Sequence, residues 1–408
     1  MLFLKEMKKT VVSVIFLVFL VAIVAFAKSQ NILDFSKDNK ITPPRQGEDY
    51  GSRKKEVPEQ VMPAAFASLC SEFAQNGYTA YPIGFYKRVK LNGKKQGQMA
   101  EILAALSGIP AGGWMNLDGS PINWEELTLE EDLSYEEFKG YMKRADGLIG
   151  GGSKYSEDFL PSYGSVPVTF WEAREEYLLV AGTDRFTGAY ARYFCDYFGI
   201  ILSVLPVFFA VSVCLQDRKA GMCDLVYARK ISSFKLVVTR YLAVLASILL
   251  PVVILSYVSS ASVWGIYGEQ GIDYFLPLKY VAGWLMPSVM VAAAVGMFFT
   301  ELTGTPVAVA IQAIWWFVDI NSSVARIDGK QVLFQLIPRH NSLGGTQIFL
   351  DNFQRLAANR VLCAGAALAL VLMTVIIYGQ KRRGKINGHE KNTKFFTGLA
   401  DRKGKPAA

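Results

Sequence analysis

Six long apolar stretches alternate with polar and charged segments along the chain. Each is about as long as an α-helix must be to cross a ~30 Å hydrocarbon layer at roughly 1.5 Å per residue. The stretches cover residues 10–27, 197–215, 236–262, 280–299, 302–320 and 361–378. The pattern therefore predicts an all-α polytopic membrane protein with six transmembrane helices, and the 51% content of hydrophobic residues agrees with that class.

The longest polar segment, residues 28–190, lies between the first two stretches. Residues 28–60 are polar and rich in proline, and such a composition buries too little apolar surface to fold by itself. We expect a tether there. Residues 61–188 have a helical pattern and predict a mainly helical domain. Its expected helices cover residues 62–73, 96–106, 134–149 and 169–180.

Two of these expected helices begin with a capping signal. Ser134 precedes Glu137 by three positions, and Thr169 precedes Glu172 by the same spacing. Each pair can form the reciprocal bonds of a capping box, in which each side chain accepts a backbone N–H. Gly150 follows the first helix and can end it in a left-handed conformation.

Basic residues orient the six stretches, because lysine and arginine resist translocation in short flanks. Residues 1–9 carry three lysines against one glutamate, the loop 216–235 has five basic and two acidic residues, and the tail 379–408 has nine and two. Residues 28–190 have 18 basic and 23 acidic residues. Both termini and the first of these loops are therefore expected in the cytoplasm, and the inserted domain outside.

The loops 263–279 and 321–359 are then extracellular as well. The second of them contains a half-apolar stretch, residues 332–337, which predicts a segment that lies on or dips into the outer leaflet. The net charge of +8 is concentrated at membrane flanks, where it can meet anionic lipid heads, so it does not argue for a nucleic-acid partner.

The chain lacks the residues that common hydrolytic sites need. It has two histidines, His340 and His389, and neither a zinc motif nor a Ser/His/Asp order can be drawn with them. Residues 147–154 have two glycines at the spacing of a phosphate-binding loop, but they end in Ser-Lys and follow an expected helix. We interpret them as a flexible turn. No catalytic residue, cofactor site or metal site is expected in this chain, and it is not expected to be an enzyme.

Five cysteines are too few for a disulfide framework. Cys70 and Cys195 are the only pair that an oxidising exterior could join, and we expect unpaired thiols.

The central turns of the six stretches contain no ionisable residue. Gln312 is the most polar residue there, and Asp319 and Arg360 lie at the ends of stretches. Ion-coupled carriers generally need ionisable groups or broken helices near the middle of the membrane. A transport function would therefore need energy from a partner.

The loop 216–235 contains a short apolar strip, because Met222, Leu225 and Val226 follow the i, i+3, i+4 spacing of one helix face. Ser232 or Ser233 can cap the helix that follows. Two interpretations remain open from these residues alone. The loop is either a connector at the membrane surface or a docking helix for a cytoplasmic protein.

Residues 191–211 and 216–244 resemble permease subunits of type-two ATP-binding-cassette (ABC) exporters, especially those of Gram-positive bacteria with a large extracellular insertion. Residues 148–155 resemble the extracellular domain of such proteins. The positions that match the family's pattern in the loop and the next span are Asp217, Arg218, Arg229, Ser232, Ser233 and Arg240.

The resemblance implies that the loop contacts a separate cytoplasmic ATPase that binds ATP and magnesium, and that a second permease chain completes the pathway in the bacterial plasma membrane. The residues expected to bind the ATPase are Asp217, Arg218, Met222, Leu225, Val226, Arg229, Ser232 and Ser233. Two other classes stay open. A membrane-anchored receptor would work through its extracellular domain alone, and an intramembrane enzyme would need a catalytic carboxylate or histidine.

Overall fold

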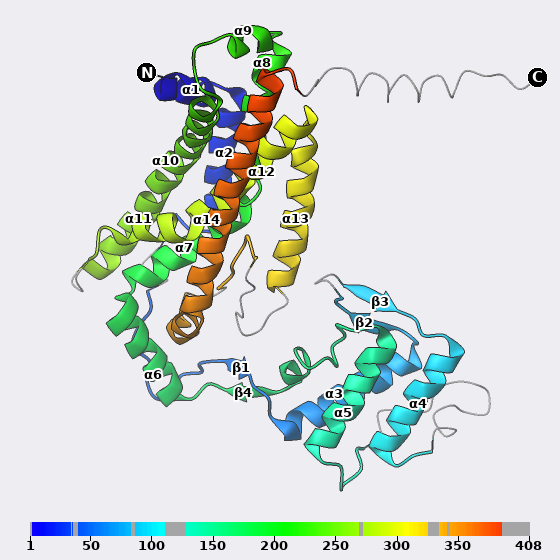
Figure 1. Cartoon of the computed structure of the whole chain (residues 1–408). Helices are drawn as coiled ribbons and strands as arrows, with labels where there is room; N and C mark the ends of the chain where they lie inside the picture. The colour runs from blue at the N-terminus through cyan, green and yellow to red at the C-terminus, as the bar shows by residue number, and fades with distance from the viewer. Residues whose placement is uncertain are drawn as a thin grey trace, which may run out of the picture. The chain divides into compact units, whose positions relative to one another are not determined.

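The computed structural model describes residues 2–33, 35, 40–82, 86–110, 128–268, 272–324, 334–340 and 343–385. The chain divides into two compact units. Met1–Ile41, Leu179–Ile320 and Gln331–Ala408 form one, here called the bundle unit, and Thr42–Leu178 with Asn321–Lys330 form the other, here called the inserted unit. The prediction of a mostly helical protein is confirmed (Figure 1).

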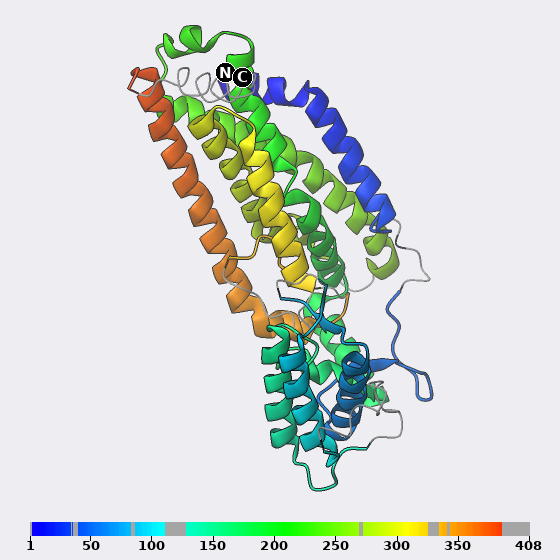
Figure 2. The same ribbon diagram turned by 90° about the vertical axis from the view of Figure 1, so that its right-hand side faces the viewer.

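Long helices make up the bundle unit (Figures 1 and 2). In chain order they are α1 Leu2–Val11, α2 Val14–Ser29, α7 Thr187–Leu202, α8 Pro206–Lys219, α9 Cys223–Tyr227, α10 Ser233–Tyr267, α11 Leu276–Tyr280, α12 Met286–Thr303, α13 Val307–Val324 and α14 Thr346–Arg382. Two π-helical turns, η5 Val180–Asp184 and η7 Val281–Leu285, precede α7 and α12.

Three helices in the described residues are long and apolar enough to cross a membrane: α10, α14 and the continuous helix Leu276–Thr303. Two bent pairs, α1 with α2 and α7 with α8, raise the number to five if each pair is one span. The apolar part of α13, Val307–Ser322, is shorter. Membrane association is thus supported by length and composition.

The bends in the first two stretches depart from the straight spans expected at residues 10–27 and 197–215. α1 meets α2 at 65°, and α7 meets α8 at 43°. Ser13 caps the new start of α2 by accepting the N–H of Phe16 at 3.2 Å. Pro206 is the first residue of α8 and has no N–H with which to continue the ladder of α7.

The break between α7 and α8 leaves carbonyl groups that helix α13 satisfies. Gln312 donates its side-chain amide to the carbonyl of Ser203 at 2.7 Å, and the indole of Trp316 donates to the carbonyl of Ile200 at 2.7 Å. Unpaired backbone groups are costly in hydrocarbon. The polar Gln312 is therefore a structural partner of the bend.

Helix α12 is the most buried of the spanning helices and packs between α8 and α14. Its close approach to α8 depends on Gly296, where an added Cβ would lie 2.6 Å from the Cβ of Ala210 and 3.1 Å from the carbonyl oxygen of Val207. Small residues permit this approach between helices in a membrane.

Part of the expected extracellular loop 321–359 is packed among the helices. Leu336 and Ile337 are buried in the apolar core of the bundle unit. Ser288 of α12 donates to the carbonyl of Leu336 at 2.6 Å, and the carboxylate of Asp319 accepts the N–H of Ile337 at 2.7 Å. Helix α14 also begins at Thr346, well before the expected residue 361. The predicted boundary at residue 359 is wrong, because α14 begins at Thr346. Polar side chains of the helices supply partners for the backbone of the buried residues.

The inserted unit has a helical core and two small antiparallel pairs of strands. Its helices are α3 Pro58–Ala74, α4 Gly93–Ser107, η4 Leu160–Tyr163, α5 Tyr135–Ile149 and α6 Phe170–Leu179, which ends at the unit boundary. The strands β1 Ser52–Lys54 and β4 Ser165–Pro167 pair, as do β2 Tyr78–Ala80 and β3 Lys87–Val89. Leu69, Phe138 and Met142 lie in its apolar core.

The four helices expected in this unit are present, and the caps form as expected. Glu137 accepts the N–H of Ser134 at 3.1 Å, and the Ser134 hydroxyl accepts the N–H of Glu137 at 3.3 Å. Gly150 ends α5 with a φ of 113°. The expected tether is only partly correct, because β1 and the start of α3 fall within residues 28–60.

The glycine run after α5 forms a tight turn at a helix end. Gly150, Gly151 and Gly152 all have positive φ. An added Cβ at Gly152 would lie 3.0 Å from the carbonyl oxygen of Tyr81, so the turn packs closely on another segment. A phosphate-binding loop opens a helix instead.

Candidate functional site: the basic loop between α8 and α10

The loop begins where α8 ends in a Schellman motif. The N–H of Gly221 donates to the carbonyl of Arg218 at 3.1 Å, and that of Met222 donates to the carbonyl of Asp217 at 2.8 Å. This pattern satisfies the last carbonyls of a helix. Gly221 has a φ of 64°, which glycine adopts without strain. The chain can therefore turn sharply into α9.

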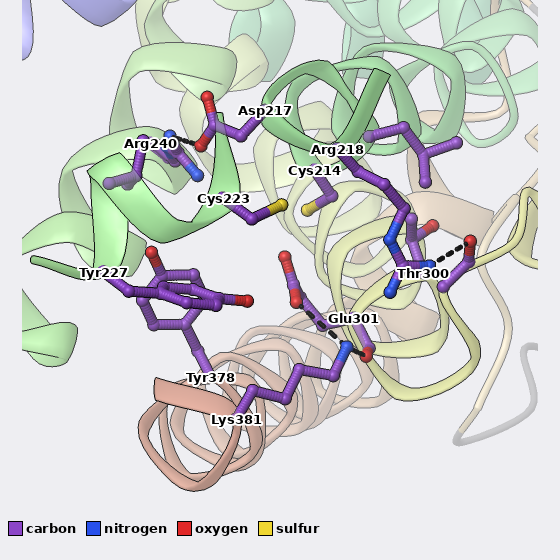
Figure 3. Close-up of a pocket in the computed structure, with 13 residues that line it drawn as sticks. Cys214, Asp217, Arg218, Cys223, Tyr227, Arg240, Thr300, Glu301, Tyr378 and Lys381 are labelled. Atoms are coloured by element: carbon purple, nitrogen blue, oxygen red, sulfur yellow. Dashed lines mark hydrogen bonds and ion pairs between the residues drawn. The ribbon is translucent and has the colours of Figure 1, made fainter. Parts of the chain in front are cut away.

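Asp217 and Arg218 connect α8 to different helices (Figure 3). Asp217 accepts a hydrogen bond from the guanidinium of Arg240 on α10, and Nε of Arg240 lies 3.7 Å from Oε2 of Glu6 on α1. Arg218 donates from Nη1 to the carbonyl oxygen of Gly304 at 2.7 Å, where α12 ends. Two adjacent residues thus tie α8 to α10 and to α12.

Gly304 is required at this position for two reasons. It ends α12 in the left-handed region, with a φ of 71°, and its N–H donates to the carbonyl of Thr300 at 2.8 Å. An added Cβ would lie 1.8 Å from Nη1 of Arg218. Any side chain here would strain the backbone and displace the arginine.

Helix α14 joins the site through two consecutive basic residues. Nζ of Lys381 lies 3.4 Å from Oε2 of Glu301 on α12 and also donates to the carbonyl of Glu301. Arg382 donates to three carbonyl groups of the loop, those of Tyr227 at 2.8 Å, Arg229 at 2.5 Å and Ile231. The side chain of Arg382 therefore fixes residues 227–231 of the loop to α14.

A cavity of about 30 Å³ lies among these side chains (Figure 3). A buried water needs roughly 10–15 Å³ of such volume and a few polar partners. Thr300 and Tyr378 each have a buried hydroxyl oxygen without a hydrogen-bond partner among the described residues. The cavity therefore has the size and the partners for a small number of waters at the junction of α8, α12 and α14.

Two residues of α9 line this cavity and titrate outside their usual ranges. Burial raises the pKa of the Tyr227 phenol to about 12, and nearby Glu301 adds to the effect. Burial also raises the pKa of the Cys223 thiol. Both groups therefore stay protonated near neutral pH, and Cys223 is a poor nucleophile.

Apolar side chains at the N-cap of α9 and within α9 are exposed. Met222 is 49% exposed and Leu225 is 65% exposed. Val226 points the other way and packs against the core of the bundle unit. The expected apolar strip is thus divided, with two residues outside and one inside.

The other expected site residues take different positions. Ser232 caps α10 by accepting the N–H of Lys235 at 3.2 Å, as expected. Ser233 begins α10 beside Gly379 of α14, where an added Cβ would lie 3.7 Å from the serine hydroxyl. Arg229 is exposed, and its part in the loop is the carbonyl that Arg382 binds.

Four residues that organise this site were not predicted from the sequence. Glu301, Gly304, Lys381 and Arg382 are far from the loop in sequence. The two basic residues entered only the charge count of the tail. Glu301 could have been predicted to form an ion pair, because it is a single acidic residue at the end of an apolar stretch.

A second set of ion pairs lies at the opposite end of the bundle unit. Arg192 donates to Asp184 at 2.9 and 3.0 Å, and Thr346 donates to the same carboxylate at 2.6 Å. Asp196 accepts from Arg339 at 3.1 Å. Buried ionisable side chains therefore occur in the bundle unit, next to the ends of the predicted apolar stretches and outside their central turns.

Within the described parts of the chain, no group of three or more histidine, cysteine, aspartate or glutamate side chains could hold a metal ion. All five cysteines are described and free. What the loop offers is an exposed apolar surface on α9 whose base is bonded to several long helices.

No known protein family, curated protein or solved structure matches this chain.

Proposed function

We propose that this chain is the permease subunit of an ABC transporter, an exporter, that forms a substrate pathway in the membrane and is driven by a separate cytoplasmic ATPase. The observation that carries the proposal is the construction of α9. It exposes Met222 and Leu225, while the segments at its two ends are bonded to long apolar helices. An ATPase that binds Met222 and Leu225 could therefore transmit its conformational change to these helices.

Hydrogen bonds and an ion pair on both sides of α9 connect it to the long helices. On one side, Asp217 and Arg218 lead to α10 and to the end of α12. On the other side, Arg382 connects the loop to α14. A displacement of α9 by a partner would therefore act on three long helices together. The water-sized cavity leaves polar side chains between them room to change partners.

The remaining parts of the proposal follow from the resemblance and the charge distribution. The loop and both termini lie in the cytoplasm of a bacterium, and the inserted unit lies outside the plasma membrane. ATP and magnesium bind to the ATPase, and a second permease chain, identical or different, completes the pathway. The residues that face the ATPase are Met222 and Leu225, with Arg229 steering its approach.

Orientation is tested by labelling in intact cells. A cysteine at Ser134 should react with an impermeant thiol reagent, and a cysteine at Ser232 should react only after lysis, because the basic loop stays inside. Cys223 is replaced by serine in both variants, since it is the native thiol nearest to the loop position. Labelling of the Ser232→Cys variant without lysis would contradict the orientation.

Coupling is tested with Leu225→Asp. Truncating or charging a buried apolar anchor at an interface typically costs about 1–4 kcal/mol, so the ATPase should no longer co-purify with this variant. ATP hydrolysis linked to transport should fall by about tenfold or more, while membrane insertion is unchanged because the side chain contacts solvent.

The matched control is Leu178→Asp, which makes the same change at an exposed leucine of α6. It should leave both the complex and its ATP hydrolysis intact. If Leu225→Asp retains the ATPase and couples normally, the loop is only a connector. A receptor that acts through its extracellular domain then becomes the better explanation.

A further inference from the structure

A second, larger cavity lies between the α1–α2 bend and α8 in the bundle unit. Its volume is about 380 Å³, which falls in the range of small-molecule sites. Lys9, Thr10, Ser13, Ile15, Phe209, Ser212, Val213, Gln216, Lys219 and Ala220 line it. Lys9 and Thr10 of α1 and Ile15 of α2 line it from the two sides of the 65° bend.

The charge of this cavity is positive. Lys9 and Lys219 line it from opposite helices, and no acidic residue is part of the lining. Lys9 contacts Glu6 at 3.2 Å, and the buried carboxylate of Glu6 also lies near Arg240. Lys219 is exposed and forms no ion pair among the described residues. An anion entering the cavity would meet two ammonium groups.

One face of α8 supplies neutral polar groups beside these lysines. Ser212, Gln216 and Lys219 follow one another at spacings of four and three residues, so they share a helix face. Neither the Ser212 hydroxyl nor the Gln216 amide makes a hydrogen bond to another described residue. Both groups can donate to the oxygen atoms of a phosphate, as the ammonium groups can.

The other wall of the cavity is apolar and continues into an exposed apolar surface. Ile15, Phe209 and Val213 form this wall, and Phe209 packs edge-on against Phe19 at 5.3 Å between ring centroids. Along α2, the exposed residues that follow are Val14, Leu17, Val18 and Val21. A ligand that fits both surfaces has a negative head and a hydrocarbon tail.

We propose that this cavity binds the phosphate headgroup of an anionic phospholipid, whose acyl chains lie along α2. Basic pockets between spanning helices on the cytoplasmic side are suited to anionic headgroups. The amphipathic α1 has exposed Leu4 and exposed lysines, which places it at headgroup depth. The inference rests on membrane association and on the proposed cytoplasmic location of the loop end, and it does not depend on the ATPase.

The test is native mass spectrometry of the full-length protein in detergent, titrated with phosphatidylglycerol, with phosphatidylcholine and with inorganic phosphate. Phosphatidylglycerol should bind with one tight site, phosphatidylcholine should not, and millimolar inorganic phosphate should not displace the lipid. Each lysine near a headgroup contributes roughly fivefold in affinity, so Lys9→Gln/Lys219→Gln should weaken the tight site about 30-fold.

The control is Lys8→Gln/Lys230→Gln, which removes the same charge from exposed positions outside the cavity and should leave the tight site unchanged. A second variant, Ser212→Leu, fills the cavity without changing charge and should weaken the site as well. Three results would overturn the proposal: equal loss in the control, displacement by inorganic phosphate, or a tight site that survives in both cavity variants.

Discussion

The two ends of the bundle unit differ in the partners of three arginines, Arg218 and Arg382 at the loop end and Arg192 at the opposite end. At the loop end, Arg218 and Arg382 donate to backbone carbonyls around a water-sized cavity. At the opposite end, Arg192 is wholly buried and donates to Asp184, which Thr346 also binds.

The contacts at the two ends differ in how much free energy it costs to break them. A buried charge that loses its only counterion is strongly unfavourable, so the Arg192 pair holds one arrangement. A carbonyl that loses an arginine at a partly exposed position can bind water instead, so the loop end can exchange partners at lower cost. We therefore expect the opposite end to act as a fixed base, and the hydrogen bonds of Arg218 and Arg382 at the loop end to change partners more readily.

The largest effect on the free energy of unfolding is expected from Arg192→Ala. Removing one partner of a buried ion pair costs about 3–5 kcal/mol, because Asp184 would remain charged and buried. The free energy of unfolding in detergent should fall by that amount. Arg192→Met/Asp184→Leu removes both charges and should restore most of the loss. A loss below about 1 kcal/mol in the single variant would show that this end is not a fixed base.

A smaller effect is expected at the loop end from Arg382→Ala. The variant loses three hydrogen bonds to loop carbonyls, but water can replace them, so the cost is about 1–2 kcal/mol. The loss should be local and should appear as roughly tenfold faster hydrogen exchange in α9, with little change in global unfolding. The neighbouring exposed Arg383→Ala should leave the exchange unchanged. Equal global destabilisation by Arg382→Ala and Arg192→Ala would remove the distinction between the ends.

The smallest effect concerns pH and the inserted unit. Hydrogen bonds from Ser134 lower the pKa of Glu137 from its usual 4.5. A lowered folded-state pKa stabilises the unit above the unfolded-state pKa, and this stability is lost as the pH falls below about 4.5 and through the folded-state pKa. Hydrogen exchange at the start of α5, corrected for intrinsic rates, should therefore speed up on acidification.

Glu137→Gln keeps a hydrogen-bond acceptor and removes the titration, so its exchange should not respond to pH in this range. If α5 in the Gln variant responds as the native helix does, the capping box is not the cause.

Local signals in the sequence predicted local structure well. The Ser134 and Glu137 box, the Ser232 cap and the body of α10 all depend on residues within a few positions of one another. The hydrophobic pattern also predicted the long apolar helices. These features need no knowledge of what packs against them.

Features that depend on distant residues were missed or placed wrongly. The bend before Pro206 was visible in principle, because proline interrupts the helix ladder, but an apolar run alone does not show an angle. Arg382 was counted as a tail charge, since only the fold brings it to the carbonyls of Tyr227 and Ile231. Leu336 was expected on or in the outer leaflet, and its burial among the helices was missed because the polar partners of its backbone come from other helices.

The bend between α7 and α8 has a consequence for the timing of synthesis. The carbonyl of Ile200 has a nearby donor in the Ser203 hydroxyl at 2.9 Å, but its bond from Trp316 and the bond from Gln312 to the carbonyl of Ser203 form only when those residues have been made, 116 and 109 residues later. At about 5–20 residues per second, a ribosome needs roughly 5–25 s to cover that distance. During this interval the backbone at the bend between α7 and α8 lacks the donors from α13 and contacts lipid, the insertion machinery or water. The hydrogen bonds at the bend are complete only after α13 has been made and packed.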